Sequence, residues 1–303
     1  MMTDTKSLAG FLNLDKPQGW TSHDCVAKVR RLLKLKKVGH GGTLDPMATG
    51  VLPIAVGKAT RLIQYLPPGK AYNATVRFGV RTTTDDLEGE TISVKPNSGV
   101  TLESVRQAIP QFIGSIAQIP PKYSAIQVDG KRLYDLARAG EDVEVPSRQV
   151  EISSIDILDW RNGEFPEVDL AIACGGGTYI RAIARDLGDV LGCGATLAQL
   201  LRTHSSGFSI AESWTIDRLA ETVENNELQL LPPESALKHL PSLSLPETLA
   251  QRWRQGQRLQ LDDAQQESKF VAVVDEMGTF LGVGTWKPNQ SPPVLAPKMV
   301  FDR

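Results

Sequence analysis

Residues 39–50 read GHGGTLDPMATG, and this loop decides how the rest of the chain is interpreted. Its four glycines permit backbone conformations that other residues avoid. Asp45 directly precedes Pro46, and a residue before proline is restricted towards an extended conformation. The pattern therefore predicts a stiff loop that presents a single carboxylate. An aspartate is ionised at neutral pH and can act as a nucleophile or a base.

The same residues also fit a purely structural role. In glycine-rich turns an aspartate side chain often accepts hydrogen bonds from nearby backbone amides. His40, in the same loop, could act as an acid or base, or could serve only as a hydrogen-bonding residue. The loop sequence leaves these alternatives open.

A strand and a basic helix are expected before the loop. Residues 10–14 (GFLNL) form an apolar strand candidate, and residues 15–19 (DKPQG) form a turn. Ser22 can cap the helix that follows. Residues 1–70 carry 11 Lys and Arg against 4 Asp and Glu, although the whole chain has a net charge of −2. This asymmetry indicates one basic face, either for binding a polyanion or simply for solvation.

Further strands and a helix are expected after the loop. Residues 70–78 alternate apolar and polar side chains, which is typical of a half-buried strand. Residues 81–90 (RTTTDDLEGE) form a polar loop. Residues 168–173 form a strand that runs through three glycines into a helix at residues 178–187. Arg181 lies in the first turn of this helix, where a cation opposes the helix dipole unless an anion lies nearby. A solvated arginine beside Asp186 or Asp189 is the alternative.

Two regions differ in composition. Residues 110–140 interleave basic and aromatic residues, as in PPKYS and KRLY, which suits contact with phosphates and bases. A surface hairpin with ordinary tyrosine packing fits them as well. Residues 224–246 are rich in Asn, Glu and Pro and are expected to be a linker. Beyond them, residues 270–274 and 279–286 predict a β-hairpin in a small β-rich domain.

Several function classes are excluded. The three cysteines share no CxxC spacing, which argues against a disulfide framework or a zinc site and favours a reducing, cytoplasmic compartment. Gly57-Lys58 does not complete a P-loop, and no GxGxxG motif follows the triple glycine. The histidines show no metal spacing. No signal peptide and no membrane span are expected.

Together these segments resemble the bacterial tRNA pseudouridine-55 synthases, the TruB type. The matching segments, in family order, are GFLNLDKPQGWTSHD, VGHGGTLDPMATGVLPIAVGKATR, KAYNATVRFG, PPKYSAIQVDGKRLYDLAR, GGGTYIRAIARDLG and LLRTHSSGF. They cover most of residues 10–210, and the GHGGTLDPMATGVLP block is highly specific.

The resemblance implies an α+β fold in which a central mixed, largely antiparallel sheet is flanked by helices. It implies a catalytic domain at residues 1–235, with an RNA-clasping insertion at about residues 110–150. A small β-barrel domain of the PUA-like type is implied, more weakly, at residues 236–303.

The resemblance also assigns roles to individual residues. Asp45 matches the essential aspartate, Tyr72 the tyrosine that stacks on the target base, and Arg181 the arginine that pairs with the aspartate. His40 matches a histidine involved in base flipping, and Tyr179 and Leu201 match further pocket residues. The RNA contacts expected in the insertion are Lys122, Lys131 and Arg132.

The implied reaction converts uridine 55 in the tRNA T-loop to pseudouridine. It needs no redox partner and no phosphate donor, so neither a cofactor nor a metal is expected. The expected partner is the T-arm of tRNA; a monomer is expected, with no membrane or protein partner. One alternative is a non-catalytic protein of the same fold that binds or folds tRNA. Another is a nucleoside or glycoside hydrolase, which would usually show a carboxylate pair, and no second acid stands out near Asp45.

Overall fold

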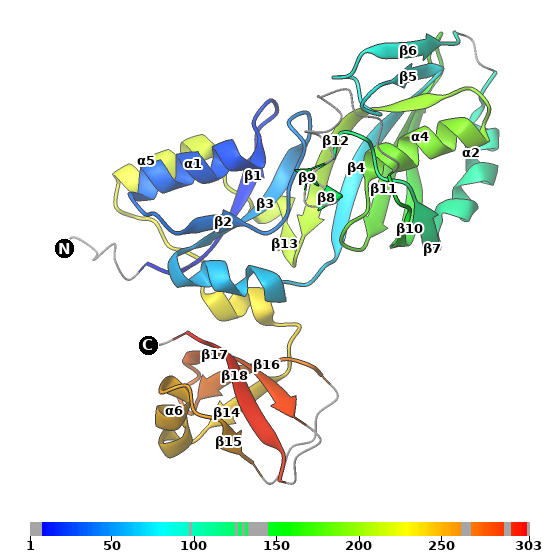
Figure 1. Cartoon of the computed structure of the whole chain (residues 1–303). Helices are drawn as coiled ribbons and strands as arrows, with labels where there is room; N and C mark the ends of the chain where they lie inside the picture. The colour runs from blue at the N-terminus through cyan, green and yellow to red at the C-terminus, as the bar shows by residue number, and fades with distance from the viewer. Residues whose placement is uncertain are drawn as a thin grey trace.

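The structure is a computed structural model, and it describes residues 8–96, 99–124, 127–128, 131–132, 145–261, 268–287 and 292–301. Of residues 127–128 and 131–132 only the backbone is described. Two larger sheets organise the chain (Figure 1). The first sheet contains nine strands in the described residues, and its main path runs β1-β3-β12-β4-β11-β10-β7. Its other two strands, β2 and β13, pair with β3 and β12.

The strands of this sheet are β1 (Gly10–Lys16), β2 (Val38–His40), β3 (Thr49–Val56), β4 (Lys70–Phe78), β7 (Gly114–Gln118), β10 (Arg148–Arg161), β11 (Glu167–Cys174), β12 (Ala195–Ser205) and β13 (Phe208–Ser209). All of their pairings are antiparallel except the short parallel contact between β3 and β12. The predicted α+β class with a mixed, largely antiparallel sheet is confirmed.

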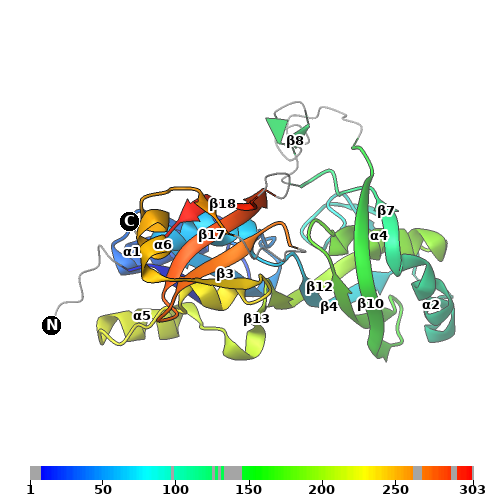
Figure 2. The same ribbon diagram turned by 90° about the horizontal axis from the view of Figure 1, so that it is seen from below.

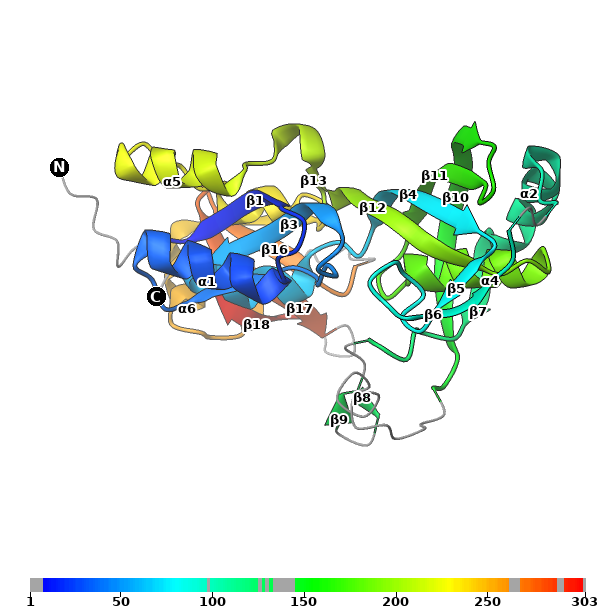
Figure 3. The ribbon, with the colours of Figure 1, turned by 90° about the horizontal axis from the view of Figure 1, so that it is seen from above.

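The basic helix α1 (Ser22–Leu33) covers the β1–β3 end of the sheet. It packs there beside α5 (Ile216–Glu224), as Figures 1 and 3 show. The predicted cap residue is wrong by one position, because the Thr21 side chain accepts from the Asp24 N–H and forms a capping box. Ser22 instead exchanges two hydrogen bonds with the backbone of Leu44.

The other half of the sheet is covered by two helices whose apolar sides share one core. They are α4 (Ile180–Val190) and α2 (Leu102–Ala108), which continues into the 3₁₀ helix η3 (Ile109–Phe112). The predicted strand at residues 168–173 and the predicted helix at 178–187 are confirmed with slightly shifted ends. The predicted polar loop at 81–90 forms turns beside a small hairpin of β5 (Val80–Thr82) and β6 (Thr91–Val94).

The second sheet lies in the C-terminal part and runs β14-β16-β17-β18-β15 in the described residues. Its elements are β14 (Ser242–Leu245), α6 (Glu247–Arg254), β15 (Leu259–Gln260), β16 (Val271–Asp275), β17 (Phe280–Lys287) and β18 (Val294–Val300). The predicted hairpin is β16–β17. Trp253 of α6 is fully buried in the core of this sheet and donates to the Leu281 carbonyl.

The predicted linker at residues 224–246 is more ordered than its composition suggests. Leu231 exchanges two backbone hydrogen bonds of 2.8 Å with Phe11 of β1. The 3₁₀ helix η5 (Pro233–Leu237) buries Leu237 in an apolar cluster shared by the 3₁₀ helix η2 (Gly57–Tyr65) and the second sheet. The segment therefore packs onto both parts of the chain.

The insertion contributes one short strand pair, β8 (Gln127–Val128) with β9 (Lys131–Arg132). Figures 2 and 3 show this pair standing away from the main sheet. None of the described helices combines the length and the apolar character that a bilayer crossing requires.

Gly50 marks the point where three strands meet. It pairs with Lys16 of β1 and with Arg202 of β12, and its φ of +102° favours glycine. A Cβ at this position would lie 2.3 Å from the Arg202 carbonyl oxygen and 2.9 Å from its nitrogen, so no larger residue fits unless the strands move.

We expect Gly50→Ala to lower the free energy of unfolding by about 3–5 kcal/mol, because backbone strain and a backbone clash add together. Gly19→Ala is the matched control: Gly19 also has a positive φ, of +79°, but no atom lies within 4 Å of its Cβ position. It should cost only about 1–2 kcal/mol. Urea unfolding of both variants measures the difference, and equal costs would contradict the clash.

Candidate active site

A cavity of about 700 Å³ opens where the Asp45 loop, β4, the 84–88 turn and the start of α4 come together. Its lining includes Asp45, Tyr72, Tyr179 and Arg181. The remaining lining residues are Thr21, Ser22, His23, Thr43, Leu44, Pro46, Lys70, Thr84, Asp86, Glu88, Tyr123, Ser124, Gly177, Thr178, Ile180 and Leu200. Four of the residues predicted from the sequence are thus brought into one cavity from separate segments.

The loop that carries Asp45 is fastened to the sheet by Arg202. This arginine is fully buried, and its guanidinium donates to the carbonyls of Gly42 and Thr43, each at 3.1 Å, and of Val51 at 2.7 Å. These acceptors lie on both sides of Asp45 in the sequence. Arg202 has no carboxylate partner among the described residues, so its charge is solvated by backbone carbonyls.

Two more side chains hold the same loop from the α1 side. Ser22 accepts from the Leu44 N–H at 2.8 Å, directly before Asp45. Lys16 is fully buried and donates to the Pro46 carbonyl, directly after Asp45, at 3.2 Å. Burial lowers the pKa of Lys16, and its further hydrogen bonds to backbone carbonyls offset the cost of burying its charge.

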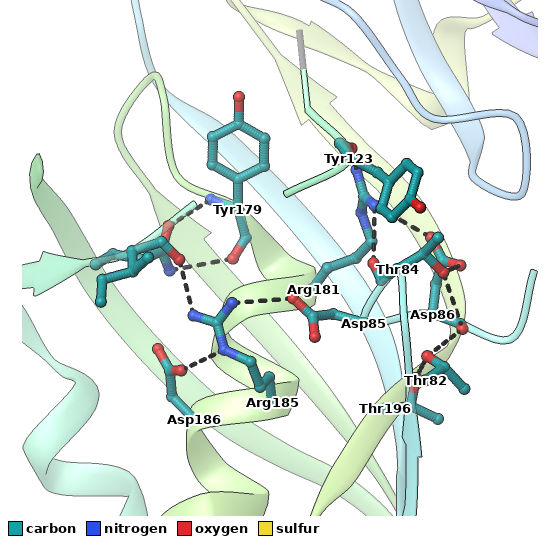
Figure 4. Close-up of polar contacts among 12 residues, drawn as sticks. Thr82, Thr84, Asp85, Asp86, Tyr123, Tyr179, Arg181, Arg185, Asp186 and Thr196 are labelled. Atoms are coloured by element: carbon teal, nitrogen blue, oxygen red, sulfur yellow. Dashed lines mark hydrogen bonds and ion pairs between the residues drawn. The ribbon is translucent and has the colours of Figure 1, made fainter. Parts of the chain in front are cut away.

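Arg181 lies between two carboxylates. Its Nε is 3.0 Å from Asp45 Oδ2 and its Nη1 is 3.4 Å from Asp86 Oδ2. The guanidinium also donates to the carbonyls of Thr84, at 2.9 Å, and Tyr123, at 3.1 Å (Figure 4). The contact with Asp45 is an ion pair without hydrogen-bond alignment at Nε. The two carboxylates offset the unfavourable interaction between the Arg181 charge and the helix dipole.

The alternative of a solvated Arg181 is wrong. Its side chain is only 5% exposed, whereas that of Asp45 is 34% exposed and so remains accessible from the cavity. The two acids considered as partners contact other arginines: Asp186 pairs with Arg185, and Asp189 pairs with Arg81.

The expectation that Asp45 has no second acid nearby is also wrong. Asp86 is buried, shares Arg181 with Asp45, and accepts from the Glu88 N–H and the Thr84 hydroxyl. Glu88 lines the cavity. Its pKa is raised mainly by burial, and further by the negative charges of Asp86 and Asp45. Both acids belong to the 81–90 loop, for which the sequence pattern predicts only a polar character.

Tyr72 lies on the buried face of β4, 5% exposed, with its ring at the cavity. Burial raises the pKa of its phenol to about 12, against the opposing effect of Arg202. The phenol is therefore neutral at physiological pH. An aromatic side chain at this depth can both pack in the core and face a bound ring.

His40 lies at the end of β2, behind the cavity lining. Its Nδ1 accepts from the Gly42 N–H at 3.3 Å, and burial lowers its pKa, so the ring is neutral with its proton on Nε2. Its ring meets that of His23 edge-on, with centroids 5.6 Å apart, and His23 lines the cavity. His23 was not predicted, and its place in the TSHD segment is the only signal for it.

Of the two remaining residues predicted for the pocket, Tyr179 lines the Asp45 cavity and Leu201 does not. Tyr179 precedes α4 at the cavity, and its backbone N–H and carbonyl are both bonded by the Gln118 side chain. Leu201, in contrast, lines a separate cavity of about 400 Å³, which Leu200 and Asn73 also line. Of the two leucines, only Leu200 lines the Asp45 cavity as well.

Of the predicted RNA contacts, Lys122 is exposed next to the cavity residue Tyr123. Lys131 and Arg132 form strand β9, and their side chains lie outside the described part of the structure. Within the described residues, no cluster of three or more His, Cys, Asp or Glu side chains is placed to hold a metal. The three cysteines are free and buried.

Models of known families match nearly the whole chain. Residues 30–180 match the N-terminal domain of TruB family pseudouridylate synthases. Residues 181–238 match the tRNA pseudouridylate synthase B C-terminal domain, and residues 241–301 match the C-terminal model of pseudouridine synthase II TruB. The chain belongs to the TruB family. As a pseudouridylate synthase it is an isomerase, which confirms the predicted family and enzyme class.

Curated TruB relatives are similar along their whole length. A protein of Trichormus variabilis named tRNA pseudouridine synthase B is 59% identical over 295 residues, covering 97% of this chain and 99% of the relative. A Synechocystis protein with the same name is 55% identical over 296 residues, with the same coverage.

Solved structures support the fold of this TruB chain. A chain of an H/ACA RNP bound to a substrate RNA containing 2′-deoxyuridine superimposes with a TM-score of 0.74 at 26% identity, over 96% of this chain and 84% of the other. A chain from a Cbf5-Nop10-Gar1 complex gives 0.73 at 27% identity, with the same coverage. The predicted pseudouridine-synthase fold is thereby confirmed.

We expect Arg202→Met to slow pseudouridine formation by about 100-fold, because a displacement of about 1 Å at the reacting group can cost this much. It should also lower the free energy of unfolding by about 2–4 kcal/mol, since the buried Val51 carbonyl and the carbonyls of Gly42 and Thr43 lose their donor. Arg77→Met is the control, because Arg77 is a partly exposed arginine of β4 that pairs with Glu167 and does not line the cavity. Single-turnover kinetics and urea unfolding test both effects. A rate equal to that of the control would contradict a positioning role.

Proposed function

We propose that this protein converts uridine 55 in the T-loop of tRNA to pseudouridine, with Asp45 as the attacking carboxylate. The observation that supports this proposal most directly is the ion pair of 3.0 Å between Arg181 and a partly exposed Asp45, in a cavity that Tyr72 also lines. The relatives named tRNA pseudouridine synthase B support tRNA as the substrate.

The reaction is an isomerisation. The C1′–N1 bond breaks, the base rotates, and C1′ bonds to C5; C5 loses a proton and N1 gains one. Arg181 holds Asp45 in place at the cavity through their ion pair of 3.0 Å, which positions the carboxylate for nucleophilic attack. The attack is on C1′ of the sugar or on C6 of the base, and the residues of the site suit both routes.

The target base must leave the RNA stack to reach Asp45. Unstacking costs a few kcal/mol, and stacking of the base on Tyr72 would recover part of this. Tyr179 lines the same pocket from the start of α4, and His23 lines it too, with the ring of His40 packed against His23. Leu200 takes the pocket role that the sequence assigned to Leu201.

The competing functions make different predictions. A hydrolase would use a second carboxylate to activate water and would release free uracil. Asp86 is engaged by Arg181 and by the 84–88 turn, which disfavours it in that role. A non-catalytic tRNA-binding protein of the same fold would bind tRNA without turnover. We further propose a cytoplasmic monomer that acts without cofactor or metal.

We expect Asp45→Asn to abolish pseudouridine formation while the tRNA Kd changes less than about threefold, because one carboxylate oxygen is replaced and the shape is kept. The control is Asp217→Asn on the exposed surface of α5. Mass mapping of a T-loop stem-loop RNA provides the readout. Turnover by Asp45→Asn, or free uracil from the unmodified protein, would overturn the proposal.

The insertion is expected to bind the RNA backbone. Lys122→Ala, Lys131→Ala and Arg132→Ala should each weaken tRNA binding, and each should reduce the slope of log K against log salt by about one if the side chain neutralises one phosphate. Binding titrations between low and moderate salt measure the slope. A slope equal to that of the unmodified protein would show that these residues bind no phosphate.

A further inference from the structure

Lys70 is a cavity residue to which neither the sequence reasoning nor the proposed reaction gave a role. It is the first residue of β4 and stands two positions before Tyr72, on the same face of the strand. Its strand neighbours are Cys174 of β11 and Ser205 of β12. An ammonium group is thereby placed beside the ring on which the target base is proposed to stack.

This ammonium has no hydrogen-bond or ion-pair partner within the part of the chain that the structure describes. Burial is the main effect that lowers the pKa of Lys70, and the like charge of Arg202 lowers it further. Nζ lies 3.5 Å from the position that a Cβ of Gly42 would take, and Arg202 Nη1 lies 3.8 Å from the same position. The two cationic groups therefore lie close together. Of these two, only Lys70 lines the cavity.

A half-buried cation without a counter-charge is costly, and an anion placed in the cavity would relieve that cost. Asp45 does not serve this purpose, because it pairs with Arg181. Asp86 also contacts Arg181, and Glu88 lies on the 84–88 turn beside it. The counter-charge that suits Lys70 would have to come from the substrate.

We infer that Lys70 is a further catalytic residue, whose ammonium stabilises the negative charge that develops on the uracil ring during isomerisation. This inference rests on the proposed function, and it holds for both routes of attack. If C1′ is attacked, the C1′–N1 bonding pair leaves with the base, and the uracil becomes an anion with charge on O2 and O4. If C6 is attacked, the C5–C6 π pair moves into the C4 carbonyl as an enolate.

In each route the charge is transient. It is neutralised when C5 bonds to C1′, and the proton lost from C5 is balanced by one gained at N1. A cation fixed before the reaction stabilises such a charge without reorganisation, and loss of one such group costs on the order of 100-fold in rate. A contact between Lys70 and an RNA phosphate is the competing role. It is disfavoured because Lys70 lies next to the buried Tyr72 rather than on an exposed surface.

The test compares Lys70→Met, which keeps the length of the side chain but removes the charge, with Lys70→Arg, which keeps the charge. Single-turnover rates at saturating T-loop RNA should fall by about 100-fold for Lys70→Met and clearly less for Lys70→Arg, with Kd nearly unchanged. Lys95→Met is the control, because Lys95 is exposed and its ammonium bonds the Gly192 carbonyl, away from the cavity. A raised Kd with an unchanged rate would assign Lys70 to a phosphate and would overturn the inference, as would unchanged values of both.

A second measurement holds even if Lys70→Met folds poorly. Fluorine at C5 withdraws electrons and stabilises negative charge on the ring, so RNA with 5-fluorouridine at the target should depend less on Lys70. The ratio of the rates at which 5-fluorouridine and uridine are consumed does not depend on the fraction of folded enzyme. It should rise in Lys70→Met, and an unchanged ratio would overturn the inference. Failure of the proposed function would look different, because the unmodified protein would then form no pseudouridine.

Discussion

The buried guanidinium of Arg202 is the constraint on which the site depends. It bonds carbonyls on both sides of Asp45 in the sequence, while the backbone of the same residue pairs with Gly50 and Tyr72 in the neighbouring strands. A buried charge is stable only when its hydrogen bonds are satisfied, so the loop cannot leave the sheet without exposing an uncompensated cation. The position of Asp45 is thus determined by the folding of the sheet, before any RNA binds. This is the kind of preorganisation that nucleophilic and electrostatic catalysis require.

The charged side chains around the cavity fall into two groups: some bond the backbone of the Asp45 loop, and others line the cavity. Lys16 and Arg202 are fully buried and bond backbone carbonyls, so they shape the loop. Arg181 bridges Asp45 and Asp86, so its charge is compensated by two carboxylates. Lys70 alone faces the cavity as a cation without a partner among the described side chains. The cavity is therefore lined by the ammonium of Lys70 as well as by the carboxylate of Asp45.

Much of this arrangement could be predicted from the sequence, and the remainder has identifiable causes. Periodicity predicted β4, β11 and α4, because their apolar residues repeat at the spacing of one face. The family motifs brought Asp45, Tyr72 and Arg181 together, which no local pattern could do, since they are separated by up to 136 positions in the printed sequence. Asp86 and Glu88 were missed because a polar loop has no period, and burial of its carboxylates depends on Arg181 packing over it. Leu201 was predicted for the pocket, whereas the leucine that lines the Asp45 cavity is its neighbour Leu200, a difference of one residue that a sequence motif does not resolve. The linker was misjudged because its composition does not show that Leu231 pairs with β1.

The apolar cluster shared by the two sheets has a consequence for how the molecule behaves as a whole. Phe11 and Leu62 of the catalytic part pack in the same cluster as Phe280 and Val283 of the C-terminal sheet, with Leu237 between them. Separating the parts would expose this cluster to water at about 25 cal/mol for each Å² of apolar surface. Unfolding of the C-terminal sheet would therefore remove apolar packing from β1 and β3. Because the Asp45 loop leads directly into β3, the loop would be less firmly held. Any ligand that stabilises the C-terminal sheet is in this way thermodynamically linked to the stiffness of the catalytic loop, although no residue of that sheet lines the cavity in the described part of the chain.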